Sequence, residues 1–220
     1  MFNIPTVTVA SQTLGSAAET ITLDYAAPDV SWTPRHLVIR WTARSNEAVS
    51  VERGVSLRLN GDTGANYYDQ RIDGAVSAVG SGAATGVTSI TNIGVDTGNN
   101  SAAYGWSSGE FILPDALSTR SHKSVIGFSG AIEQRVRIGT ARWANTAAIT
   151  SISLSQDGSG AFLAGSIVEL CVVDESYNIN EQILGSAGVL TVSSIAADIG
   201  DLVQIGNMKR TQAAISDEYK

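Results

Sequence analysis

The chain is poor in the residues from which many enzyme and metal sites are built. It has 220 residues, with one cysteine and two histidines. A single cysteine excludes an internal disulfide and any cysteine-rich metal site. Cys171 lies in the apolar run IVELCVV, where a buried, inert thiol is expected. Neither His36 nor His122 lies in a GxSxG-like context that would indicate nucleophilic catalysis. We therefore expect no enzymatic activity and no cofactor.

Charged residues are also scarce. They make up 16% of the chain, against 43% hydrophobic residues, whereas about 25% is typical of soluble domains. The net charge of −7 argues against nucleic acid as the main partner. The N-terminal sequence MFNIPTVTVASQ has no basic start and no continuous apolar stretch, so neither a signal peptide nor a membrane span is expected there.

The few basic residues are unevenly distributed. All 14 fall within residues 35–71, residues 120–142 or the last dozen positions. Between Arg142 and Lys209 the chain has acidic residues but no Lys or Arg. Two readings remain open: either this segregation creates complementary faces that pair copies of the protein, or folding interleaves the segments and removes the asymmetry.

Alternation of apolar and polar residues with period two dominates the chain. In HLVIRWTARS, Leu37, Ile39 and Trp41 alternate with polar or smaller residues, as in a strand with one buried face. Similar segments are TITLDY (20–25), GVSLRL (54–59), GEFILP (109–114), SVIGFSG (124–130), QRVRIG (134–139), AITSISLS (148–155) and GSIVELCVV (165–173). Turn signals separate them, namely NG at 60–61, DG at 73–74 and DGSG at 157–160. This pattern predicts an all-β, antiparallel β-sandwich of jelly-roll type, with an immunoglobulin-like sandwich as the alternative.

The pattern also suggests a domain organisation. We expect an N-terminal arm at 1–19, the sandwich domain at 20–177 and a C-terminal extension at 178–220. Residues 73–109 lack Lys and Arg and are rich in Gly, Ser and Ala. They are read as a long excursion that reaches a neighbouring subunit, or else as a disordered surface loop. VTSITNIGV within it is a candidate for one more short strand.

The C-terminal extension contains a faint internal similarity. DLVQIGNMKRTQAAISD at 201–217 can be laid against HLVIRWTARSNEAVSVE at 36–52. Few residues match, so the similarity indicates either the start of a second β module or chance.

The stretch NGDTGANYY has the most site-like composition. Asn60, Asp62 and Asn66 offer oxygen ligands at close spacing, but the EF-hand pattern and its bidentate Glu are missing. No GK[ST] follows the glycines, so the stretch is not a phosphate loop. A structural turn fits best, because Asn60 and Gly61 tolerate positive φ and Asp62 can close an Asx-turn. A weak calcium or polar-ligand site at Asn60 and Asp62 is the alternative.

Aromatic residues offer another way to bind a partner. Trp41 lies on the apolar side of its strand and is expected in the core. Trp106, in the loop AAYGWSSG, is expected to be exposed, as an interface anchor or a glycan contact.

Three blocks of the sequence together resemble a family. They are LVIRWTARSNEAVSVERGVSLRLNGDTGANYYDQRI (37–72), ILPDALSTRSHKSVIGF (112–128) and WANTAAITSISLSQDGSGAFLAGSIVELCVV (143–173). The combination of an ARS strand, an NGDTGANY segment, a K-S element and a closing AAITxIxL…AGS hairpin resembles virion proteins of tailed bacteriophages. The resemblance covers about residues 20–173. LCVV stands where that group often has LYG.

The resemblance implies a jelly-roll component of the virion, assembled in the cytoplasm of the host bacterium and without catalytic residues. A capsid decoration or cement protein that forms homo-oligomers, as trimers, and binds the major capsid protein is the leading expectation. A tail-fibre or tail-associated module that binds a host surface glycan is the alternative. The residues expected to make contacts between subunits or with the particle are Trp106 and the arginines expected to point outward, namely Arg40, Arg44, Arg58, Arg135 and Arg137.

Overall fold

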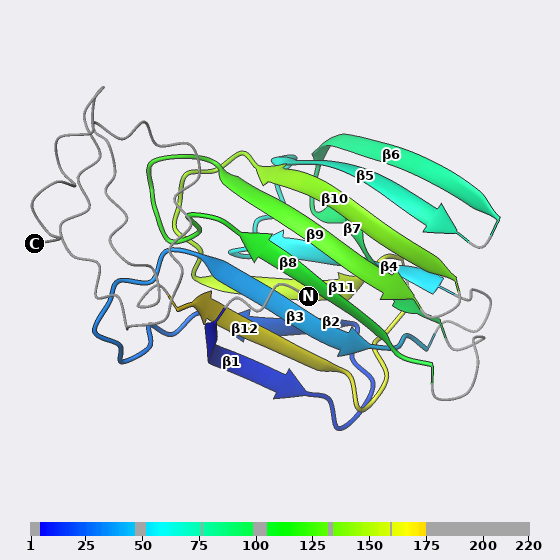
Figure 1. Cartoon of the computed structure of the whole chain (residues 1–220), viewed down its shortest axis with the longest axis horizontal. Coiled ribbons are helices and arrows are strands. Elements are labelled where there is room, and N and C mark those ends of the chain that lie inside the picture. The colour runs from blue at the N-terminus through cyan, green and yellow to red at the C-terminus, as the bar shows by residue number, and fades with distance from the viewer. Residues whose placement is uncertain are drawn as a thin grey trace, which may run out of the picture. The chain divides into compact units, whose positions relative to one another are not determined.

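The computed structural model describes residues 5–46, 52–75, 77–98, 105–131, 134–158 and 160–174. Within these ranges the chain forms strands in the following order (Figure 1): β1 (Thr6–Thr13), β2 (Thr20–Asp24), β3 (Leu37–Ala43), β4 (Glu52–Leu59), β5 (Tyr67–Ala75), β6 (Ala78–Val87), β7 (Ile90–Thr97), β8 (Ser107–Leu113), β9 (Lys123–Ala131), β10 (Arg135–Trp143), β11 (Ser151–Gln156) and β12 (Ile167–Val173).

The strands form two sheets. The larger sheet has eight strands in the order β1-β12-β3-β8-β9-β10-β5-β6, and the smaller has four in the order β2-β11-β4-β7. All neighbouring strands are antiparallel. Figure 1 shows β1 and β6 at opposite edges of the larger sheet, with the smaller sheet behind it. The all-β, antiparallel β-sandwich expected from the sequence is confirmed.

The pairing of strands is nested. In the larger sheet β1 pairs with β12 and β3 pairs with β8. In the smaller sheet β2 pairs with β11 and β4 pairs with β7, and a β4–β11 pair joins these two pairs. If β5, β6, β9 and β10 are left out, successive strands alternate between the two sheets from β1 to β4 and again from β7 to β12, while β4 and β7 pair within the smaller sheet. Those four strands lie side by side and continue the larger sheet beyond β8.

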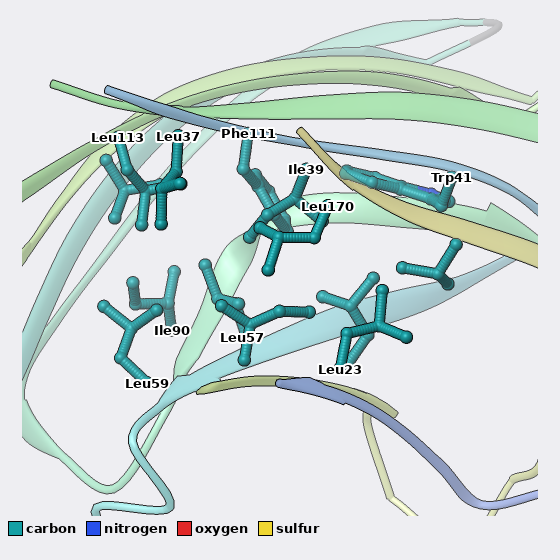
Figure 2. Close-up of a cluster of buried hydrophobic side chains, with 14 of the residues drawn as sticks. Leu23, Leu37, Ile39, Trp41, Leu57, Leu59, Ile90, Phe111, Leu113 and Leu170 are labelled. Atoms are coloured by element: carbon teal, nitrogen blue, oxygen red, sulfur yellow. The ribbon is translucent and has the colours of Figure 1, made fainter. Parts of the chain in front are cut away.

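The core fills the space between the sheets. Leu37, Ile39 and Trp41 point inward from β3 and are nearly or fully buried, as their alternation predicted. Figure 2 shows them on one side of the core, facing Leu57 and Leu59 of the smaller sheet. Their burial removes apolar surface from water, which is the main force that holds two sheets together.

One glycine makes room for the largest ring in this layer. The rings of Trp41 and Phe111 lie with centroids 4.5 Å apart. Trp41 also covers its cross-strand neighbour Gly109, where a Cβ atom would lie 2.0 Å from Trp41 Cζ2. Any other residue at position 109 would therefore displace the indole.

Two expectations about the chain's organisation are corrected. Residues Thr6–Thr13, assigned to an N-terminal arm, form the edge strand β1, in register with β12 from Thr6 opposite Val173 to Thr13 opposite Ile167. The alternation in TVTVASQT supports this strand once β12 supplies a partner. The arm prediction failed because it treated a strand at the edge of a sheet as unstructured chain.

The segment 73–109 is likewise neither a long excursion nor a loop throughout. It contains β6 and β7, and β7 includes most of the predicted short strand VTSITNIGV. Asp73 and Gly74, read as a turn, lie inside β5. Small residues allow β6 to pair with β5 without a break from Thr85 to Ala78. The extension 178–220 and its similarity to 36–52 lie outside the described residues.

Candidate interaction surface

The outer face of the larger sheet differs between its two halves. Over β3, β8 and β12 it carries charged and hydroxyl groups beside apolar residues, of which Ile167 is 39% exposed. Arg40 on β3 forms an ion pair with Glu110 on β8, with Nε 2.7 Å from Oε2, and donates from Nη1 to Thr6 Oγ1 at 2.9 Å. Arg40 therefore faces outward, as the sequence suggested, but its guanidinium is engaged within its own sheet.

Over β5, β6, β9 and β10 the outer face is apolar. We call the outward-facing residues of these four strands the apolar face. Its large side chains are well exposed: Ile72 is 61% exposed, Val79 83%, Ile126 42%, Val136 69% and Ile138 56%. Large aliphatic side chains gathered at such exposure mark interaction sites. This is the strongest candidate for a functional surface in the described chain.

The strand register sets the layout of the apolar face. Ile138 on β10 lies between Ile72 on β5 and Phe128 on β9. One step along the strand, Val136 lies between Gly74 and Gly130. One row therefore consists of three bulky residues, and in the next row a single bulky residue stands between two glycines. The face consequently has raised and recessed parts.

A groove of about 600 Å³ opens on this face. It is lined by Ile72, Ile126 and Ile138, by small residues such as Ser81 and Ala83 of β6, and by Gln70 and Arg71 of β5. The walls are mostly aliphatic, and a groove of this kind binds apolar side chains of a partner.

Charge is nearly absent from the apolar face. Among the outward positions of these four strands, all within the described chain, the one charged residue is Arg142, at the end of β10. Its guanidinium carbon lies 4.3 Å from the centre of the Tyr68 ring, a cation–π arrangement. The rest of the face has no charged group that would have to be desolvated on binding.

The polarity of β10 is the reverse of what its sequence suggested. Arg135 and Arg137 were expected to point outward, but they point into the molecule, and Arg137 is only 7% exposed. Val136 and Ile138 consequently point outward. A strand's period of two fixes which residues share a face but not which face is buried. Trp143 and Ala141 share the inner face with the arginines and are buried in the core.

The inward arginines are held by acidic side chains and by a backbone carbonyl. Arg135 lies 2.6 Å from Glu52 on β4 and also contacts Asp73 on β5, and Arg71 Nε donates to Asp73 Oδ1 at 2.7 Å. Arg137 Nη1 donates to the Gly94 carbonyl of β7 at 2.9 Å. The contacts of Arg135 join β10 to β4 and β5, but neither Glu52 nor Asp73 belongs to the segment between Arg142 and Lys209, so the two readings of the charge segregation stay open.

Electrostatics of this cluster follow from burial and close partners. Burial alone would raise the pKa of the Asp73 carboxyl, but the hydrogen bond from Arg71 and the charges of Arg135 and Arg137 outweigh it and hold the pKa below its usual value. Burial lowers the pKa of Arg137. The cluster is thus a structural ion network on the inner side of β5 and β10.

Two further predicted contact residues take different positions. Arg44 was expected to point outward, but it is 8% exposed, because the chain leaves β3 after Ala43 and Arg44 bridges to Thr97 of the smaller sheet. Its carbonyl accepts from the Leu163 N–H at 2.7 Å. Arg58 lies on the smaller sheet, where its Nε donates to the Thr88 carbonyl at 3.2 Å.

The outer face of the smaller sheet is lined by hydroxyl groups. Register brings Thr22 of β2 beside Ser153 of β11, and their hydroxyl oxygens lie 3.0 Å apart. Ser153 in turn lies beside Arg58 of β4. This face is polar, whereas the apolar face of the larger sheet is not.

The NGDTGANYY stretch is a turn whose oxygens are used within the protein. Asp62 Oδ2 accepts from Trp143 Nε1 at 2.6 Å and from Asn66 Nδ2 at 2.9 Å, and Oδ1 accepts from the Gly64 N–H at 2.7 Å. The hydrogen bonds from Trp143 and Asn66 lower the pKa of the Asp62 carboxyl. This carboxylate therefore ties the turn to the end of β10.

Asn60 has a similar role on the other side of the turn. Asn60 and Gly61 both have positive φ, 51° and 64°. The Asn60 side chain donates to the Ala148 carbonyl at 2.8 Å and accepts from the Thr150 N–H at 2.7 Å. Both residues named as weak calcium ligands thus hold the β4–β5 and β10–β11 connections together, which supports the turn reading.

Trp106 was expected to be exposed, but it is partly buried. A Cβ atom at Gly165 would lie 3.2 Å from its Cη2, so the indole rests on that part of the backbone. Two other aromatic residues, Tyr67 and Trp143, stack in the core with ring centroids 6.3 Å apart.

Sequence reasoning missed two buried ionisable groups. Lys123 is 1% exposed and donates from Nζ to the carbonyls of Ser118, Ser121 and Thr146; burial lowers its pKa. Asp96 on β7 is fully buried, and burial raises its pKa to about 7 despite the hydrogen bond from Gln156 Nε2 at 2.7 Å. Asp96 carries no sequence signal, because its burial depends on contacts from strands such as β11 that are distant in sequence. Lys123 was noted only as part of the K-S element, and its bonds to three carbonyls are a property of the folded loops around it.

Comparison with protein-family models, curated proteins and solved structures finds no match. Among the described residues no helix is long and apolar enough to cross a membrane.

Proposed function

We propose that this chain is a structural protein of a tailed-bacteriophage virion, built on a jelly roll, that attaches to the capsid as a homo-oligomer and stabilises it. The single observation that carries the proposal is the apolar face on β5, β6, β9 and β10. A surface with five large aliphatic side chains in water is costly unless a partner covers it. A structural protein within a particle has such partners throughout its life.

The strand order agrees with this proposal. A jelly roll is a long antiparallel hairpin rolled into two sheets, so its strands pair in nested fashion across them. β1–β12, β2–β11, β3–β8 and β4–β7 have this nested order. β5, β6, β9 and β10 are then additions that widen one sheet, and they are the strands that carry the apolar face.

The test compares particles assembled with and without this chain. Cryo-EM maps of the intact particle are expected to show the sandwich in regular positions on the shell, with the apolar face covered. Particles lacking the chain are expected to release their DNA at a lower temperature. If the sandwich is absent from the maps of complete particles, the proposal is wrong.

A matched pair of variants links particle binding to the apolar face. Ile138→Lys places a charge on it, whereas Ser153→Lys places the same charge on the outer face of the smaller sheet. Both positions lie in the middle of a strand, on its outward side. We expect Ile138→Lys to reduce the occupancy of the chain on particles and Ser153→Lys to leave it unchanged.

A second candidate function is that of a glycan-binding module in a tail fibre. It is favoured by a polar depression of about 280 Å³ at the smaller sheet, lined by residues including Glu19, Arg58 and Asp157. Carboxylate and guanidinium groups hydrogen-bond sugar hydroxyls. Glycan-array binding that is lost in Asp157→Ala, together with absence of the chain from the shell, would favour this function.

A further inference from the structure

We propose that two copies of this chain pack their apolar faces against each other across a two-fold axis. This inference deepens the proposed function, on which it rests, by naming the partner that covers the face.

Charge does not oppose an identical partner at the centre of the apolar face. Two copies that each carry a net charge of −7 repel each other wherever acidic surfaces meet. The three central rows of the apolar face, which contain Val136, Ile138 and Thr140 of β10, have no charged residue across β5, β6, β9 and β10. Identical surfaces can meet there without placing like charges together.

The relief of the face is self-complementary. A two-fold interface brings the same patch of both subunits together, so the patch must contain both protrusions and recesses. Ile138 and Ile72 form a raised pair beside the groove, which is also lined by the smaller Ser81 and Ala83. The raised pair of one copy can therefore enter the groove of the other, as side chains do between packed sheets.

The size of the face fits a dimer contact. Five large aliphatic side chains, most of them more than half exposed, leave on the order of 500 Å² of apolar surface in water, a large share of the roughly 800 Å² that each partner buries in a standard interface. The remaining area is available from the smaller residues between them. The face is thus large enough for a specific contact between two copies.

The edge strand next to the face also calls for cover. β6 has no charged residue and no proline along its whole length, although such residues are the usual protection of an exposed edge against unwanted pairing. A second copy seated on the adjoining face restricts access to this edge.

The experiment is sedimentation equilibrium on the purified full chain in the absence of particles. The wild-type chain is expected to form dimers at micromolar concentration. Ile138→Lys and Ile138→Glu, each alone, are expected to raise the dissociation constant at least tenfold. An equimolar mixture of the two variants is expected to restore dimers, because opposite charges then face each other across the axis.

Controls separate this contact from unfolding and from other surfaces. Ser153→Lys and Ser153→Glu carry the same charges on the smaller sheet and are expected to dimerise like the wild type. Far-UV circular dichroism and the melting temperature check folding. If the Ile138 variants fold poorly, Val136→Lys and Val136→Glu, at a position that is 69% exposed, replace them in the same mixing test.

The possible results are decisive. A wild-type chain that is monomeric up to 100 μM overturns the inference, whether the face is then covered by the chain's own C-terminal extension or by another virion protein. Dimers that persist in both Ile138 and Val136 variants overturn it too, since the contact then lies elsewhere. Because no particle is present, the outcome is independent of the particle-binding test of the proposed function.

Discussion

The two halves of the larger sheet solve the same packing problem with opposite polarity. In the half around β3, Ile39 and Trp41 point into the core and Arg40 points to solvent. In the half around β5 and β10, Asp73 and Arg137 point inward, while Ile72 and Ile138 point to solvent. A strand can therefore carry regular alternation and still present its apolar side outward, provided that its inward charges are paired.

The inverted half differs because its inner charges form a network. Asp73 contacts Arg71 and Arg135, and Arg137 is bonded to the backbone of β7. Buried charges are tolerated when their partners are close and well oriented, and removing one partner leaves the others unpaired at high cost. The apolar face outside is thus the counterpart of the ion network inside.

Removing the central acid should have the largest effect on this comparison. Asp73→Ala leaves the arginines around it without their shared carboxylate, and we expect a loss of about 4 kcal/mol in the free energy of unfolding. Asp24→Ala, at an exposed position of β2, is the matched control and should change it by less than about 0.5 kcal/mol. Urea denaturation measures both. A loss below 1 kcal/mol for Asp73→Ala would show that the network does not support the inverted half.

The same residue type in the two halves gives the next comparison. Ile39→Ala removes a fully buried side chain and should cost about 3 kcal/mol. Ile138→Ala removes one that is 56% exposed and should cost about 0.5 kcal/mol or less in a dissociated sample. Denaturation at low protein concentration tests the pair, and equal losses would contradict the assignment of Ile138 to the outer face.

Asp96 sharpens the comparison through pH. It lies on β7, and the Gly94 carbonyl of the same strand accepts the hydrogen bond from Arg137. Because burial raises its pKa to about 7 in the folded chain, the folded state holds a proton that the unfolded state has released between about pH 4 and pH 7. Its contribution to stability therefore falls as the pH rises through this range and is constant above about pH 7 to 8.

The substitution Asp96→Asn removes that titration. We expect a gain of about 2 kcal/mol in the free energy of unfolding at pH 8 and little change at pH 4. Gln156→Glu, which adds a second carboxyl beside Asp96, should act in the opposite direction at pH 8. Thermal melts across pH 4 to 8 measure the effect. An equal gain in stability at pH 4 and at pH 8 would show that the gain does not come from the titration of the Asp96 carboxyl.

The smallest expected effect concerns the turn at the end of β10. Asp62→Ala removes the carboxylate that accepts from Trp143, Asn66 and Gly64 and should cost about 1 to 2 kcal/mol at pH 7. Since the folded-state pKa of Asp62 is lowered, this stabilisation is present above the unfolded pKa of about 4 and is lost as the pH falls through the folded value. Thr63→Ala, in the same turn, is the control. An added melting shift with calcium in the wild type would revive the metal reading of Asp62.

Much of the fold could be read from the sequence because local pattern and tertiary environment agree there. All eight segments with period-two alternation contain strands, and NGDTGANYY forms a turn. The strand β6 was missed because Gly, Ser and Ala give no alternation of polarity, although β5 supplies it with a full set of partners. β1 was missed because an edge strand depends on its single neighbour.

The sequence analysis pointed to one strand of the candidate surface, β10, but it chose the residues on the wrong side of that strand. Arg135 and Arg137 drew attention to β10, while its exposed residues are Val136 and Ile138. The sequence QRVRIGTARW determined by itself that β10 is a strand and which residues share each side, because backbone geometry sets the period of two. Which side is buried was decided only by the tertiary structure, because Glu52, Asp73 and the Gly94 carbonyl reach the arginines from strands that are distant in sequence.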